Sequence, residues 1–138
     1  MGECFMKHEE DDPTDPQTWL LYAKGNLNLA EKGGKLRGVR FEDLCFNAQQ
    51  AVEKSLKAVC LANDLEFPKT HSIVRLIDIL ETAKIKLPNY VRESDTLTQF
   101  AVETRYPGVT EKVTKEEYKE AITIAARVVF WAEKVLRK

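Results

Sequence analysis

One stretch of the chain, residues 41–61, has apolar side chains at intervals of three and four along its whole length. This spacing places them on one stripe of an α-helix, and a helix with such a stripe must bury it against another element. The stripe consists of Phe41, Leu44, Cys45, Ala48, Val52, Leu56, Val59 and Cys60. The opposite side carries a compact polar group that packing does not require, made of Gln50, Glu53, Lys54 and Lys57. We therefore expect the stripe to determine the fold and the polar group to be a candidate for function.

Four further segments have helical periodicity, and no segment is predicted to be a strand. The predicted helices cover residues 16–32, 41–61, 71–83, 90–104 and a long stretch that follows Thr114. Thr114 and Glu117 form a capping box, and glycine or proline follows each of the first four helices. Amphipathic helices joined by short connections predict an all-α fold, a five-helix, mainly antiparallel up-and-down bundle.

Length and charge favour a single domain in the cytoplasm. The 138 residues include 22 acidic and 21 basic side chains, a balance that argues against a broad nucleic-acid or membrane surface. Residues 1–13 have no apolar periodicity, so we interpret them as a flexible leader and residues 14–138 as one helical domain. No apolar run approaches the roughly 20 residues that a membrane-spanning helix needs, and no membrane association is expected.

Several apolar side chains lie off the predicted stripes, namely Phe46, Leu61, Ile124 and Phe130. One interpretation is a second packing surface, such as a dimer interface. The other is a bundle whose long helices are covered on more than one side. Cys45 and Cys60 lie about 22 Å apart on one helix, too far for a disulfide, so we expect reduced, packed thiols.

Metal, redox and phosphate-loop sites are not predicted. The two histidines, His8 and His71, do not lie three residues after a glutamate, as the ligands of carboxylate-bridged metal bundles do. Cysteine pairs at zinc-site spacing are absent, and the glycine pair at 33–34 lacks the spacing of a phosphate loop. We therefore expect no metal and no tightly bound cofactor.

Three groups of polar residues remain as candidates for a binding site. In the first, Lys54 and Lys57 lie one helical turn apart and could bind phosphate, with Gln50 orienting a sugar or base. An i,i+4 ion pair between Glu53 and Lys57 explains the same residues without a ligand. The second group opens the helix at 71–83, where free amides and His71 would attract an anion, or where the residues form a plain N-cap.

The third group is Arg105-Tyr106, which precedes Pro107-Gly108 at the end of a predicted helix. An arginine in the last turn can cap unpaired carbonyl groups. Arginine beside tyrosine also suits phosphate clamping combined with base stacking. Capping explains the position of Arg105, whereas it does not explain why a tyrosine follows it.

Taken together, these stretches resemble the HEPN family, the higher eukaryotes and prokaryotes nucleotide-binding domain. The matching pieces are WLLYAKGNLNLAEKG, FNAQQAVEKSLKAVCLANDLEFPKTHSIVRLIDIL and ETRYPG, followed by a long last helix, over about residues 16–137. The resemblance implies an antiparallel bundle, commonly a homodimer, in mostly prokaryotic proteins. Members are often encoded beside a small nucleotidyltransferase, as a toxin–antitoxin-like pair.

Many HEPN proteins are metal-independent ribonucleases that use an Arg-x4–6-His motif late in the bundle, and this motif is absent here. His71 is the last histidine of the chain, so none follows Arg75, Arg92, Arg105 or Arg127. The resemblance is thus to the branch with an Arg-Tyr-Pro element, and a non-catalytic role is favoured over an enzymatic one.

The sequence therefore predicts a nucleotide-binding protein that is the partner of a small nucleotidyltransferase, with ATP or GTP as a candidate ligand. The predicted site residues are Gln50, Lys54, Lys57, His71, Arg105 and Tyr106. One alternative is a divergent ribonuclease that uses His71 with Arg105, although RNA is not favoured as a ligand. The other is an adaptor whose exposed apolar face binds another protein.

Overall fold

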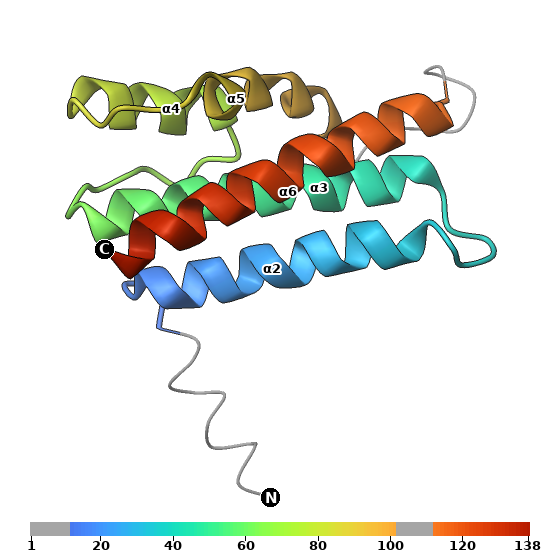
Figure 1. Ribbon diagram of the computed structural model, residues 1–138, viewed down its shortest axis with the longest axis horizontal. Coiled ribbons are helices and arrows are strands. Elements are labelled where there is room, and N and C mark those ends of the chain that lie inside the picture. Colours follow the sequence, from blue (N-terminus) through green and yellow to red (C-terminus); the bar gives the residue numbers. More distant parts are fainter. Residues whose placement is uncertain (1–11, 102–111) are drawn as a thin grey trace, which may run out of the picture.

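The computed structural model describes residues 12–101 and 112–138. Its elements are α2 (Pro16–Gly33), α3 (Phe41–Ala62), α4 (Ile73–Thr82), α5 (Asn89–Arg92), the 3-10 helix η1 (Glu93–Phe100) and α6 (Lys115–Arg137). Within these two ranges no strand occurs. The chain runs along α2 in one direction and returns along α3, and α6 also runs opposite to α2 (Figure 1). The predicted all-α, mainly antiparallel bundle is confirmed.

Helix α3 is the centre of the bundle. It contacts α2, α6, α4 and η1, and α4 and α5 lie on the side of α3 that faces away from α2 (Figure 1). The predicted apolar stripe is buried, apart from Phe41, which is half-buried. The prediction of an opposite side that packing does not require is wrong, because α3 has neighbours around most of its circumference. Polar side chains of α3 are consequently buried as well, namely Gln49, Glu53, Ser55 and Lys57.

The off-stripe apolar residues divide between the two interpretations. Phe46, Leu61 and Ile124 are half-buried, which agrees with helices covered on more than one side. Phe130 on α6 is 55% exposed. Cys45 and Cys60 are buried thiols, as predicted, and neither forms a disulfide within the described ranges. Burial raises the pKa of the Cys60 thiol to about 11.

Capping residues set the beginnings of three helices. Asp15 accepts a hydrogen bond from the backbone N–H of Gln17 at the start of α2, and the predicted capping box opens α6. Ser72 caps α4 by accepting from the N–H of Arg75, so this helix begins at Ile73, two residues later than predicted. The segment that carries His71 is therefore a connection that leads into α4.

The predicted helix at 90–104 differs most from the structure. It is a four-residue α-helix, α5, followed by the 3-10 helix η1, and its predicted last residues lie outside the described part of the chain. The Ser94 hydroxyl donates to the Val91 carbonyl at 2.5 Å, and the Thr96 hydroxyl donates to the Glu93 carbonyl at 3.1 Å. Side chains that bond nearby carbonyls compete with the α-helical pattern, which accounts for the tighter winding.

The described ranges were compared with two features, a membrane-spanning helix and a metal-binding group of side chains. Among the helices of 12–101 and 112–138, none is long and apolar enough to cross a membrane. In the same ranges, no group of three or more histidine, cysteine, aspartate or glutamate side chains is arranged to hold a metal ion.

Candidate functional site

A buried carboxylate, that of Glu53, is the centre of the polar cluster on α3. Glu53 is 1% exposed, and its Oε2 atom accepts a hydrogen bond from Lys57 Nζ at 2.8 Å. The Nδ1 atom of His71 lies 3.3 Å from each carboxylate oxygen. Lys57 of α3 and His71, from the connection to α4, thus meet at the carboxylate of Glu53.

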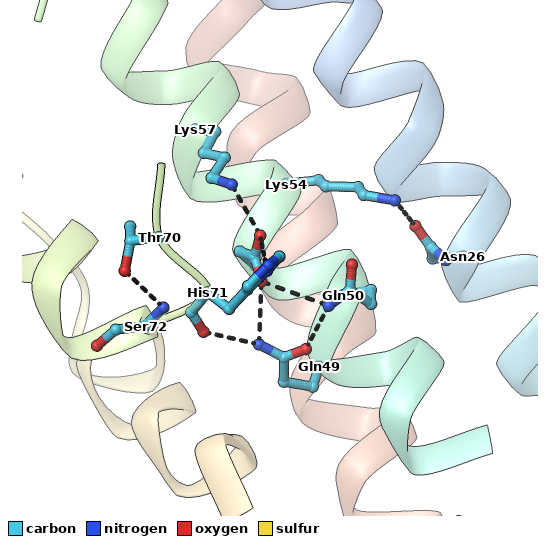
Figure 2. Close-up of polar contacts among 9 residues, drawn as sticks. Asn26, Gln49, Gln50, Lys54, Lys57, Thr70, His71 and Ser72 are labelled. Atoms are coloured by element: carbon cyan, nitrogen blue, oxygen red, sulfur yellow. Dashed lines mark hydrogen bonds and ion pairs between the residues drawn. The ribbon is translucent and has the colours of Figure 1, made fainter. Parts of the chain in front are cut away.

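Two glutamines complete the surroundings of this carboxylate. Gln49 is fully buried, and its Nε2 atom lies 3.3 Å from Glu53 Oε1 and 3.3 Å from the backbone oxygen of His71. Gln50 Nε2 donates to Gln49 Oε1 at 2.8 Å and lies 3.4 Å from Glu53 Oε1 (Figure 2). Gln49 bonds both the main chain of His71 and the carboxylate of Glu53, which also contacts the His71 side chain. It therefore links the connection before α4 to α3.

Lys57 is enclosed by its neighbours. It is 6% exposed, and its ammonium lies 5.1 Å from the ring centroid of Trp19 and 5.7 Å from that of Phe67. Both rings offer cation–π stabilisation, and Glu53 supplies the opposite charge. The predicted ion pair with Glu53 is confirmed, and little of the ammonium surface faces solvent.

Lys54 has different surroundings, although it lies less than one turn away. Its side chain points towards α2, where Nζ donates to Asn26 Oδ1 at 2.8 Å and lies 5.9 Å from the ring centroid of Tyr22 (Figure 2). Asn26 in turn donates to Asn47 at 2.9 Å. Partial burial lowers the pKa of Lys54, and the nearby Lys57 acts in the same direction, against the attraction of Glu53. Within the described chain the direct partners of this ammonium are neutral.

His71 is both exposed and held in place. Its side chain is 79% exposed, yet Nδ1 faces the buried carboxylate of Glu53. A carboxylate accepts a hydrogen bond from the N–H at Nδ1, so the neutral imidazole presents an unprotonated Nε2 to solvent, and the protonated imidazole presents an N–H donor there. The residues on either side of His71 bond nearby amides with their hydroxyl groups: Thr70 accepts from the N–H of Ser72, and Ser72 accepts from the N–H of Arg75. The predicted N-cap is confirmed at Ser72, while the side chain of His71 is exposed and is not packed against a neighbouring helix.

Of the predicted site residues, Gln50, Lys57 and His71 lie around the Glu53 carboxylate, whereas the ammonium of Lys54 reaches Asn26 on α2. Arg105 and Tyr106 lie outside the described residues. Gln49 and Asn26 were not predicted, and Glu53 was predicted as a member of the exposed polar group and as the partner of Lys57, not as a buried centre. A buried Gln49 could have been suspected from its i,i+4 spacing to Glu53, whereas the bond between Lys54 and Asn26 joins two helices and has no local signal.

Comparison with known proteins places this arrangement in context. The family model of the HEPN domain, which describes the sequences of that family, matches residues 16–135 of this chain. A protein of Methanocaldococcus jannaschii named "Putative toxin MJ1304" is 26% identical over 129 residues, covering 80% of this chain and 85% of that protein. The crystal structure of TT1696 from Thermus thermophilus is 29% identical with a TM-score of 0.70, and covers 88% of this chain and 98% of its own. ST0689, described as an archaeal HEPN homologue, has the same fold at 23% identity and a TM-score of 0.66, with the same coverage.

Proposed function

The chain belongs to the HEPN domain family, and on this premise we propose that it is a non-catalytic member that binds the phosphate groups of a nucleotide where α2, α3 and α4 meet. The observation that carries the proposal is a set of three polar groups at α3: two of them lie beside the Glu53 carboxylate, and the third belongs to the next residue, Lys54, and extends towards α2. These groups are the exposed imidazole of His71, the amide of Gln50, and the ammonium of Lys54, which bonds no carboxylate among residues 12–101 and 112–138.

The charges of the cluster favour an anion. Glu53 and Lys57 neutralise each other as a buried pair, which leaves Lys54 as a net positive charge. An ammonium that is partly removed from water attracts phosphate more strongly than a fully hydrated one. Protonated His71 adds a donor at Nε2. Lys57 is buried, so its ammonium does not reach a ligand. Its role in the site is to neutralise and hold the carboxylate of Glu53.

The remaining groups suit the other parts of a nucleotide. Gln50 is half-buried and offers amide atoms to a sugar or base. Tyr22 is 39% exposed beside Lys54, so its ring gives a base a surface for stacking. The name of the relative from Methanocaldococcus jannaschii includes the word toxin, and this supports our proposal that the chain is one half of a toxin–antitoxin-like pair with a small nucleotidyltransferase.

Lys54→Glu tests the proposed phosphate site. We expect the dissociation constants for ATP and GTP to rise about ten- to hundredfold, since a hydrogen bond to a charged group contributes roughly 1.5–3 kcal/mol. Isothermal titration calorimetry measures both ligands. Lys119→Glu, at an exposed position of α6, makes the same change of charge elsewhere and should leave binding unchanged. Equal affinities of the Lys54→Glu variant and the unsubstituted protein would contradict the site.

One observation favours a second candidate, a divergent metal-independent ribonuclease. Glu53 holds Nδ1 of His71 and leaves Nε2 exposed, which is the arrangement of an oriented general base. His71 would take the proton of a ribose 2′-hydroxyl, whose oxygen attacks the adjacent phosphorus while the bond to the 5′ oxygen breaks and that oxygen takes a proton from water. If so, His71→Ala should slow the cleavage of RNA in EDTA about 10²–10⁴-fold. Cleavage at an undiminished rate, or none by the unsubstituted protein, would exclude this function.

A further inference from the structure

A chain of three hydrogen bonds leads from α3 to α2 and back to α3. Lys54 Nζ donates to Asn26 Oδ1 at 2.8 Å, as Figure 2 shows. Asn26 Nδ2 donates to Asn47 Oδ1 at 2.9 Å, and Asn47 Nδ2 donates to the backbone carbonyl of Asp43 at 3.1 Å. An ammonium can only donate and a carbonyl can only accept, so both ends of the chain set the same direction for the two amides. The side-chain oxygen of Asn26 is therefore directed at Lys54.

Lys54 has no carboxylate within reach on its own helix, in contrast to Lys57. Side chains on a helix contact those that lie three or four positions away. Lys57 has Glu53 four positions before it, and the two form a buried ion pair. Around Lys54 the corresponding positions hold Gln50, Ala51, Lys57 and Ala58. The hydrogen-bond partner of Lys54 comes instead from α2, and it is neutral.

A neutral acceptor holds an ammonium without cancelling its charge. The ammonium of Lys54 has three N–H donors, and Asn26 accepts from one of them. If this bond served only to join α2 to α3, a carboxylate at position 26 would serve better, because opposite charges form the stronger hydrogen bond. The amide of Asn26 therefore leaves the charge of Lys54 uncompensated, and no other acceptor bonds this ammonium within the described ranges.

On the basis of the phosphate site proposed above, we propose that Asn26 is the positioning residue for Lys54 at that site. Asn26 fixes the ammonium between α2 and α3 and keeps its charge available to the phosphate groups of a nucleotide. Asn47 contributes indirectly, because it accepts from Nδ2 of Asn26 and so holds the amide with its oxygen towards Lys54.

Asn26→Asp tests this role, because it introduces a charge at almost unchanged volume. The Asn47 amide can turn over and donate to the new carboxylate, so the contact between α2 and α3 is retained. The carboxylate would pair with Lys54 and compete with phosphate for its ammonium. We expect the dissociation constant for ATP, measured by calorimetry, to rise about tenfold or more, with unchanged helical circular dichroism.

Asn28→Asp is the matched control. Asn28 is exposed on the same helix, two positions after Asn26 and thus about 200° away around the helix axis. This variant has the same net charge as Asn26→Asp and should bind ATP like the unsubstituted protein. An unchanged affinity of Asn26→Asp, or an equal loss in both variants, would overturn the role of Asn26.

The outcome for Lys54→Glu separates this inference from the function on which it rests. If Lys54→Glu loses affinity for ATP and Asn26→Asp does not, the phosphate site stands and the role of Asn26 is overturned. An unsubstituted protein that binds neither ATP nor GTP would overturn the proposed function, and this inference with it.

A double-mutant cycle shows whether Asn26 acts through Lys54. In a Lys54→Gln background the ammonium is absent, so Asn26→Asp should raise the dissociation constant for ATP by a much smaller factor than in the unsubstituted protein. Titrations followed by NMR chemical shifts measure the weak binding expected of these variants. A residue that only supports the fold, or a carboxylate that repels phosphate directly, would give the same factor in both backgrounds. That result would overturn the inference.

Discussion

Glu53→Ala is expected to lower the free energy of unfolding by about 3–5 kcal/mol. The substitution leaves the ammonium of Lys57, which is 6% exposed, without its carboxylate partner. It also removes the acceptor next to the buried amide of Gln49. Urea-induced unfolding, followed by circular dichroism, measures the change through the midpoint and the slope.

Two controls separate the buried charge from other effects. Glu133→Ala breaks the surface ion pair with Lys24 and should change stability by no more than about 1 kcal/mol. The double substitution Glu53→Leu with Lys57→Met removes both charges at similar volume, so it should be less destabilising than the sum of its single substitutions. A double variant whose loss equals that sum would show that the two side chains do not act as a pair.

Leu56→Ala should lower the free energy of unfolding by about 2–5 kcal/mol. Leu56 is fully buried on α3, which is packed by its neighbours around most of its circumference, so little of the resulting cavity can collapse. The same urea measurement applies. Leu36→Ala removes the same atoms from a residue that is 63% exposed, and its effect should stay within about 0.5 kcal/mol. Similar losses in the two variants would contradict the central position of α3.

Local signals predicted most of the helices. The beginnings of α2 and α6 follow from Asp15 or Thr14, Pro16 and the Thr114–Glu117 box, because caps act within one turn of the chain. The prediction was less accurate at α5 and η1. There the apolar spacing is irregular and the hydroxyls of Ser94 and Thr96 bond nearby carbonyls. Spacing alone does not report that competition.

The sequence predicted which residues belong to the candidate site, but it did not predict their burial or their partners. Lys54 and Lys57 have the same side-chain chemistry and lie one turn apart, so the sequence treats them alike. In the structure Lys57 is enclosed by Glu53, Trp19 and Phe67, whereas Lys54 reaches Asn26 on α2. The difference arises from residues that are distant in the sequence.

By itself, the sequence determined that this chain is a bundle of amphipathic helices and which residues begin them, since periodicity and capping are properties of neighbouring residues. It also identified, through motif resemblance, the family that the model of the HEPN domain confirms. Only the tertiary structure decided that α3 is surrounded, that Glu53 is the buried centre of the polar cluster, and that His71 is held against it. The physical reason is that burial and partner choice depend on which helices meet, and that is set by packing across the whole bundle.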